Sequence, residues 1–277
     1  MRNVFDENLN MLPFFKKVDD RFPIALRKYF AGMIDGDGSI GIHKSNKTLR
    51  CSLELAEDAA SCLVHIADIF DLTVRRCTRS GERYKNYKPS LKIEFAGAKV
   101  KFFLMGIYPY LLEKKEKCKE ILIAKQCPED IFEEPLMKNR NFSYEYLAGY
   151  TDAEGSIMMT KFKKENYYRF RYALISNDRE HLKFIRSKLI EDGFEFRKLS
   201  FKNYKNVKKE RGRNPDKWKP TTVLYLKGGA AEHVKLYEKL LPFMTMTKKI
   251  KRMQDTINYD LIARMIKRKK QKYVNQK

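Results

Sequence analysis

The sequence predicts an α+β protein made of two pseudo-symmetric halves, each with the element order αββαββα. The first observation behind this prediction is a repeat: residues 29–42 read YFAGMIDGDGSIGI and residues 146–159 read YLAGYTDAEGSIMM. The second is the distance between the copies, 117 positions (154 − 37), which suits a duplicated small domain. The third is that the same order of strand and helix patterns follows each copy. With 277 residues, 43% of them hydrophobic, each half can bury a core.

The elements of the first half follow from local patterns. Alternation of apolar and polar residues predicts strands, and apolar residues at helical spacing predict helices. After the first repeat we expect a strand within 47–58, a helix over 61–72, a hairpin over 73–97, a helix over 100–111 that ends or kinks at Pro109, and a last helix over 113–125.

The second half repeats this order after a linker that contains two prolines and several acids. Its expected elements are a strand over 167–176, a helix over 179–193 closed by Gly193, a hairpin over 194–229 and a helix over 231–244. We therefore predict an N-terminal extension at 1–20, a first half at 21–126, a linker at 127–142, a second half at 143–262 and a basic tail at 263–277.

The net charge of +23 is the strongest compositional signal, since 58 Lys and Arg stand against 35 Asp and Glu. A folded protein this basic favours a polyanionic partner, nucleic acid in particular. The five cysteines are odd in number and form no CxxC pair, which favours reduced thiols in a reducing compartment. No apolar run approaches the roughly 18 residues of a membrane span, so no membrane partner is expected.

The two repeats resemble a known motif. Residues 30–38 and 147–155 are similar to the nonapeptide that names the LAGLIDADG homing endonucleases, and two copies on one chain resemble the monomeric branch of that family. The resemblance covers about residues 23–262. It implies that the two motif helices pair at the interface of the halves and that antiparallel sheets form a DNA-binding saddle. The small pairs Ala31-Gly32 and Ala148-Gly149 suit such packing, because a helical glycine costs about 1 kcal/mol against alanine and close approach would compensate.

The resemblance also implies a metal-dependent site at the ends of the motif helices. In this family the second acid of the motif ligates metal, which corresponds here to Asp37 and Glu154. The backbone carbonyls of Gly36 and Ala153 are the implied secondary ligands. Two carboxylates at the negative ends of two helices would repel each other, and Mg²⁺ removes that conflict, with Mn²⁺ or Ca²⁺ as substitutes for binding. The alternative interpretation of the motif is a tight turn after each helix.

Other residues of the motif region have expected roles. Asp35 and Asp152 are expected to cap or brace the helix ends. Family members place a basic residue near the cleavage centre, after the proline-kinked helix. Lys114 matches this position in the first half, and Lys248 or Thr247 matches it in the second; we take Lys114 and Lys248 as the catalytic candidates.

The strand residues opposite the apolar alternation are predicted to face DNA. In the first half these are Ser39, Gly41, His43, Arg50, Ser52, Glu54, Arg75, Lys92 and Glu94. In the second they are Ser156, Met158, Thr160, Arg169, Arg171, Val223 and Tyr225. Ten Lys and Arg in 197–219 and eleven in 248–277 are expected to contact phosphates, although a frayed basic extension is an equal interpretation of the tail.

These observations predict a metal-dependent, site-specific double-strand DNA endonuclease of the homing type. A ten-residue strand spans about 33 Å, so two sheets could follow about 20 base pairs of double-stranded DNA. The protein is expected to act as a monomer on an asymmetric target, in an organelle such as a chloroplast or mitochondrion or in a prokaryotic cytoplasm. The alternatives are an intron RNA maturase and a DNA-binding regulator that does not cleave.

Overall fold

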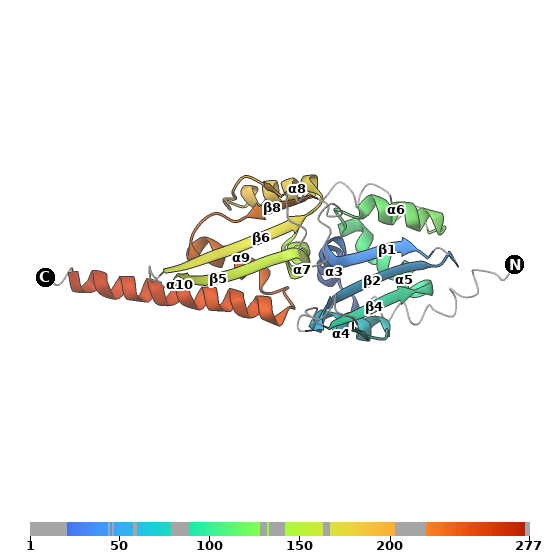
Figure 1. Cartoon of the computed structure of the whole chain (residues 1–277), viewed down its shortest axis with the longest axis horizontal. Coiled ribbons are helices and arrows are strands. Elements are labelled where there is room, and N and C mark those ends of the chain that lie inside the picture. The colour runs from blue at the N-terminus through green and yellow to red at the C-terminus, as the bar shows by residue number, and fades with distance from the viewer. Residues whose placement is uncertain are drawn as a thin grey trace, which may run out of the picture. The chain divides into compact units, whose positions relative to one another are not determined.

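The computed structural model describes residues 21–43, 45, 47–57, 60–78, 89–127, 132, 142–162, 167–202 and 220–274. The chain divides into two compact units, and each is described by itself below (Figure 1). Unit 1 is Met1–Ala153 and unit 2 is Glu154–Lys277. Residues 203–219, most of the predicted basic hairpin tip at 197–219, lie outside the described residues.

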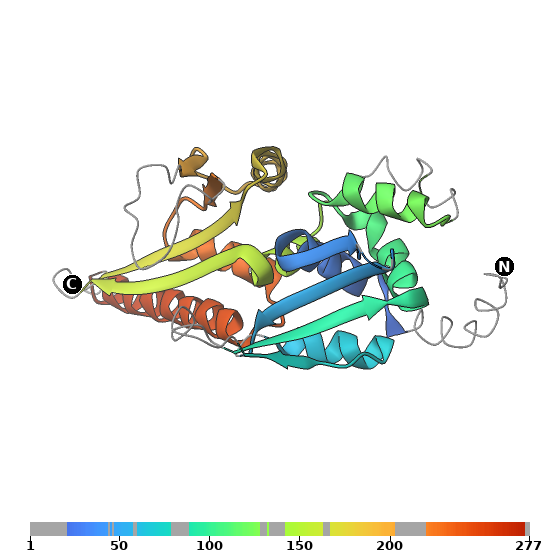
Figure 2. The same cartoon turned by 45° about the vertical axis from the view of Figure 1, so that its right-hand side comes forward.

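Unit 1 is an antiparallel sheet with helices against one face. Its strands have the order β1-β2-β4-β3, and α4 and α5 pack against them (Figure 2). The elements are α3 (Ile24–Asp37), β1 (Gly38–Ile42), β2 (Leu49–Ala56), α4 (Ser61–Phe70), β3 (Arg75–Cys77), β4 (Ser90–Ala96), α5 (Gly97–Ile107), the 3₁₀ turn η3 (Tyr108–Tyr110), α6 (Lys115–Ala124) and most of α7 (Tyr144–Glu154). The predicted order of elements in the first half is confirmed.

The core of unit 1 is aromatic. Phe95 of β4 stacks on Phe103 of α5 with ring centroids 4.0 Å apart, and Phe70 of α4 meets both rings edge-on at 5.2 and 5.5 Å. All three side chains are buried. Because the strand side chains alternate between faces, this core leaves the opposite, polar face of the sheet uncovered by α4 and α5.

Unit 2 repeats the sheet with the order β5-β6-β8-β7. Its elements are β5 (Gly155–Phe162), β6 (Tyr167–Ser176), α8 (Arg179–Glu191), β7 (Ser200–Lys202), β8 (Thr221–Tyr225), α9 (Ala230–Leu240) and α10 (Thr247–Val274). Asp178 caps α8 by accepting hydrogen bonds from the backbone amides of Glu180 and His181. Gly193 follows α8 with φ +84°, as the predicted closing glycine requires.

Helix α10 extends beyond residue 262, where the predicted second half ends. It continues through the predicted basic tail to Val274, because residues 247–274 contain no glycine or proline to end it. The helix packs along the edge strand β5, where Arg252 donates to the carbonyl of Ile157 at 2.9 Å. Within the described part of the chain, no helix combines the length and the apolar character needed to cross a membrane.

A histidine is buried in the core of unit 2. His233 of α9 lies against Phe170 and Tyr237, and its Nδ1 donates to the carbonyl of Gly229 at 2.8 Å. Its Nε2 is buried and has no hydrogen-bond partner among the described residues. Burial lowers the pKa of His233 below its ordinary value of 6.5, against smaller opposing effects of the Gly229 carbonyl and Glu232.

We expect His233 to lower the free energy of unfolding as the pH falls below 6.5. The unfolded chain takes up this proton at a higher pH than the native chain, so acid favours unfolding. Asparagine keeps a donor for Gly229 but does not titrate. Urea denaturation at about pH 7.5 and about pH 5 should therefore show a smaller acid loss for His233→Asn than for the wild type. An equal loss in both proteins would contradict this, and His65→Asn, on the exposed face of α4, is the control.

Candidate functional site

The two motif helices α3 and α7 pack backbone to backbone. A Cβ built on Gly32 would lie 2.1 Å from the carbonyl oxygen of Tyr146, and one on Gly149 would lie 1.9 Å from that of Tyr29. Cβ atoms do not approach backbone atoms this closely, so only glycine fits at either position. The predicted pairing of the motif helices is confirmed, and the mid-helix glycines are explained by it.

The same helices exchange a reciprocal pair of buried hydrogen bonds. Tyr146 of α7 donates its hydroxyl to Asp35 of α3 at 2.7 Å, and Tyr29 of α3 donates to Asp152 of α7 at 2.8 Å. Burial, together with the charge of Asp35 and the hydrogen bond to it, raises the pKa of Tyr146 well above its ordinary value. Tyr146 therefore remains a neutral donor, and the two hydrogen bonds together hold the two helices in one axial register.

Asp35 braces the end of α3, as predicted, but it does so against a distant loop. Its carboxylate accepts hydrogen bonds from the backbone amides of Leu112 and Glu113 at 2.7 and 3.1 Å and of Lys114 at 2.8 Å. These amides precede α6, so the carboxylate lies where the positive end of that helix favours an anion. The interaction joins two segments that are 77 to 79 residues apart in the sequence.

The Lys114 side chain binds the end of α3 from the other direction. Its Nζ donates to the carbonyls of Ile34 at 2.6 Å, Asp35 at 2.7 Å and Gly36 at 3.2 Å. These are among the last carbonyls of the helix, where the helix carries partial negative charge, and the carbonyl of Ile34 also accepts from the backbone amide of Gly38. The structure thus brings Lys114 to Gly36, which is one of the implied metal ligands and directly precedes Asp37.

We expect Lys114→Met to destabilise the protein in the absence of divalent cations. The substitution leaves three partly buried carbonyls without the ammonium, which should lower the free energy of unfolding by about 1–3 kcal/mol. Lys117→Met removes a lysine from the exposed side of α6 and should have little effect. Urea denaturation in EDTA measures both variants. Equal stabilities would show that the contacts of Lys114 do not contribute to the fold.

The four implied metal-ligating residues occupy the ends of the two motif helices. Asp37 is the last residue of α3 and Gly36 precedes it, while Glu154 is the last residue of α7 and Ala153 precedes it. Each end offers one carboxylate and backbone carbonyls, which are the hard oxygen ligands that Mg²⁺ prefers. No cluster of three or more His, Cys, Asp or Glu is found among the described residues, so the donor set is small at each helix end.

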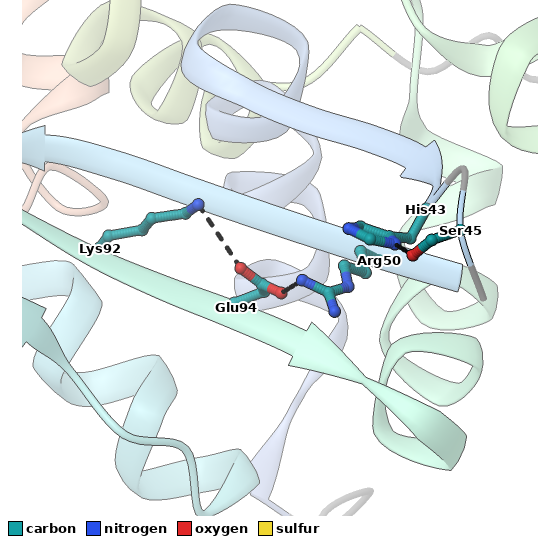
Figure 3. Close-up of polar contacts among 5 residues, drawn as sticks. All are labelled: His43, Ser45, Arg50, Lys92 and Glu94. Atoms are coloured by element: carbon teal, nitrogen blue, oxygen red, sulfur yellow. Dashed lines mark hydrogen bonds and ion pairs between the residues drawn. The ribbon is translucent and has the colours of Figure 1, made fainter. Parts of the chain in front are cut away.

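The predicted DNA-facing residues of the first half share one face of the sheet in unit 1. The strand register pairs Ser39 with Ser52 and Ser52 with Glu94, and pairs Glu54 with Lys92 and Lys92 with Arg75. Residues directly opposite each other in antiparallel strands point to the same side. Figure 3 shows the polar contacts there: Glu94 accepts from Arg50 at 2.7 Å and pairs with Lys92 at 3.5 Å, while Ser45 and His43 are hydrogen-bonded at 2.8 Å.

The corresponding face of unit 2 carries most of the predicted residues. Ser156, Met158 and Thr160 lie opposite Ala173, Arg171 and Arg169, and Tyr225 lies opposite Ala173. Val223 is different, because it is only 1% exposed, so the expectation that it faces DNA is wrong. Lys248 lies exposed on the first turn of α10, beside the alternative Thr247.

The sequence analysis missed the two bridging tyrosines. Tyr29 and Tyr146 begin the two repeats, so they occur at the same position in each copy. That coincidence is a signal, but pattern alone cannot separate a buried hydrogen-bond donor from an ordinary core aromatic residue. Only the pairing of α3 with α7 identifies Asp152 and Asp35 as their acceptors.

Comparison with known proteins supports the resemblance through structure. No protein-family model and no curated protein sequence matches the chain. Solved structures do match. The LAGLIDADG meganuclease I-AabMI, bound to uncleaved DNA, is 15% identical with a TM-score of 0.57, and the match covers 86% of this chain and 92% of that one.

Two further structures show the same likeness. The LAGLIDADG homing endonuclease I-GzeII, in complex with its DNA target, is 15% identical with a TM-score of 0.54, covering 88% of this chain and 91% of that one. The homing endonuclease I-LtrWI, bound to target DNA, is 16% identical with a TM-score of 0.51, covering 89% and 92%. The repeated motif, its two packed helices and the two four-stranded sheets are thus those of one architecture: the chain has the fold of the LAGLIDADG homing endonucleases.

Proposed function

We propose that this protein is a site-specific DNA endonuclease of the homing type that cleaves both strands of a long, asymmetric target. The observation that carries the proposal is the pair of motif helices: α3 and α7 pack through Gly32 and Gly149, and each ends in a carboxylate, Asp37 or Glu154. The neighbours of this fold named above were solved on DNA. The polar sheet faces and the net charge of +23 support the same partner.

The proposal includes a divalent cation, with Mg²⁺ as the physiological ion. The oxygen donors of Asp37 and Gly36 fit such an ion, and the ammonium of Lys114 on three carbonyls of α3 indicates that this helix end attracts positive charge. When bound, Mg²⁺ would activate a water molecule and stabilise the leaving oxygen of a phosphodiester. Glu154 and Ala153 would supply the equivalent donors for the second strand.

The other residues of the site would position these donors. Asp35 ties the end of α3 to the loop before α6, and Tyr146 holds Asp35 in place from α7. Lys114 would contribute positive charge beside the scissile phosphate, within reach of the helix end that it binds. Such pre-positioned charges lower the barrier because they need no rearrangement during the reaction.

The two halves present different side chains at equivalent positions, so we expect one protein molecule to bind one asymmetric target of about 20 base pairs. Glu54 and Lys92 lie opposite each other in unit 1, whereas the equivalent row of unit 2 holds Ile175 and the buried Val223 and so has no matching pair of charges. A homodimer on a palindrome would need identical faces.

The test is a cleavage selection from a randomised double-stranded DNA library in the presence of Mg²⁺. The proposal expects one enriched, non-palindromic sequence that is cut on both strands. Enrichment of DNA by binding without any cut would support a regulator that does not cleave. Absence of any DNA preference, with selective binding of a structured RNA, would overturn the proposal in favour of an RNA maturase.

Binding to the selected DNA should depend steeply on salt. If about eight phosphates are contacted, the logarithm of the affinity should fall with a slope of about −7 against the logarithm of the salt concentration. Fluorescence anisotropy across a salt series measures the slope. A slope shallower than about −2 would mean that the basic segments, including residues 263–274 of α10, do not contact DNA.

A further inference from the structure

Two arginines occupy equivalent positions in the two sheets. The repeat aligns Gly41 with Met158, and the strand register places Arg50 opposite Gly41 and Arg171 opposite Met158. Arg50 and Arg171 are therefore the same position of the duplicated sheet, on the polar face in both units. This equivalence follows from the register and is not visible in the motif itself.

Each arginine is held by the side chain at one equivalent position of the neighbouring strand. Glu94 lies opposite Ser52, and Tyr225 lies opposite Ala173, which is the counterpart of Ser52. Glu94 accepts from Nη1 of Arg50 at 2.7 Å (Figure 3). Tyr225 accepts from Nη2 of Arg171 at 2.7 Å, and its ring lies 4.8 Å beneath the guanidinium.

The two arginines share a further feature. The Nε atom of each is buried and has no hydrogen-bond partner among the described residues, so the base of each side chain is enclosed by the sheet. Among the described residues, each arginine makes its side-chain hydrogen bond through one terminal nitrogen. Each terminal nitrogen carries two N–H groups, so this bond leaves an N–H donor on both terminal nitrogens. The side chain of Arg50 is 41% exposed, which leaves its tip accessible.

Two terminal N–H donors in a fixed plane match the O6 and N7 acceptors of guanine in the major groove. Rotamer freedom is the main cost of ordering an arginine, and a partner on the next strand removes part of that cost before DNA arrives. An acidic residue on a DNA-binding face would repel phosphates if its charge were unpaired. Glu94 pairs with both Arg50 and Lys92, so its negative charge is balanced.

We infer that Arg50 and Arg171 are specificity-determining residues, each of which selects a guanine in the half-site bound by its own unit. Glu94 and Tyr225 act as positioning residues that orient them. This inference rests on the proposed function, since it concerns the bases read by a DNA-binding sheet. It predicts two separate guanine preferences, one lost with each arginine, on the order of 5- to 150-fold against the other bases.

The experiment is a binding selection from randomised double-stranded DNA in EDTA, so that the readout is independent of cleavage. Arg50→Ala should remove the guanine preference at one base position, and Arg171→Ala should remove it at a different one. Arg76→Ala is the matched control. Arg76 pairs with Glu57 at 3.0 Å in the same sheet, but it lies opposite Leu91 and so points to the other face.

Two conservative variants test the positioning roles. Glu94→Gln removes the charge that holds Arg50, and it should weaken the first guanine preference without lowering affinity for other sequences. Tyr225→Phe keeps the ring and removes the acceptor, and it should weaken only the second preference. If Glu94 and Tyr225 only stabilise the sheet, each variant should instead lower the affinity for all DNA sequences alike.

The outcomes separate this inference from the proposed function. If the wild type enriches a sequence and both arginine variants keep every base preference, the arginines contact phosphates only and the inference is overturned alone. If the wild type enriches no DNA sequence, the proposed function fails and the inference fails with it. Loss of one distinct guanine preference in each arginine variant would support both.

Discussion

Replacing Asp37 by asparagine, or Glu154 by glutamine, is expected to lower double-strand DNA cleavage on the order of 100-fold or more. Each change keeps the size of the side chain but removes a negative charge from the end of a motif helix. Affinity for the target should persist or increase, because less negative charge then faces the phosphates. Residual activity is expected as nicking, with the two variants biased to opposite strands.

The measurement is the cleavage rate of a selected target with each strand labelled at one end, beside a binding titration. Asp68→Asn, an exposed acid on α4, is the control and should cleave as the wild type does. If Asp37→Asn and Glu154→Gln both cut both strands at the wild-type rate, these acids are only turn residues and the endonuclease proposal is wrong.

Replacing Gly149 by alanine is expected to be among the most destabilising single changes in this chain. The new methyl group would lie 1.9 Å from the carbonyl oxygen of Tyr29 and 3.1 Å from the amide nitrogen of Met33. Both are backbone atoms, so the helices must separate, which also disturbs the hydrogen bond from Tyr29 to Asp152. The gain of up to about 1 kcal/mol in helix propensity is smaller than the cost of overpacking and of a disturbed hydrogen bond to a buried carboxylate, so the net loss should be on the order of 3 kcal/mol.

Chemical denaturation of the full chain measures this loss. Gly106→Ala is a matched control, because Gly106 is also helical, but the nearest atom to its new methyl group would be a ring carbon of Phe22 at 3.3 Å. A loss in Gly149→Ala no larger than in Gly106→Ala would mean that the two motif helices tolerate separation. Gly32→Ala should resemble Gly149→Ala, since its methyl group would meet the carbonyl of Tyr146 at 2.1 Å.

The order of elements could be predicted because it depends on local patterns. The alternation in β2 and β6 and the helical spacing in α4 and α8 are complete within each element, so neighbours in sequence are enough to identify them. The pairing of α3 with α7 came from the resemblance of the two repeats to the family nonapeptide, and the mid-helix glycines agreed with it. The order of elements alone required no knowledge of distant contacts.

The contacts of the site could not be predicted in the same way. Lys114 meets the end of α3 across about 80 residues of sequence, and only the folded chain shows that its ammonium binds carbonyls there. Val223 follows the alternation that predicts an exposed face but is buried, because the exposure of a strand residue depends on what covers it and not on alternation alone. The partners of Arg50 and Arg171 likewise depend on register, which a one-residue shift would have changed.

The boundary between the compact units has a consequence for how such a protein could be recombined. The second copy of the repeat begins within α7, at Tyr146, yet α7 up to Ala153 belongs to unit 1, where Tyr146 meets Gly32 and Asp35 and Gly149 meets Tyr29. A chimaera joined at the linker would place a foreign α7 against the native α3. Halves from two relatives are therefore interchangeable only if that helix carries a matching glycine and tyrosine, whatever DNA each half reads.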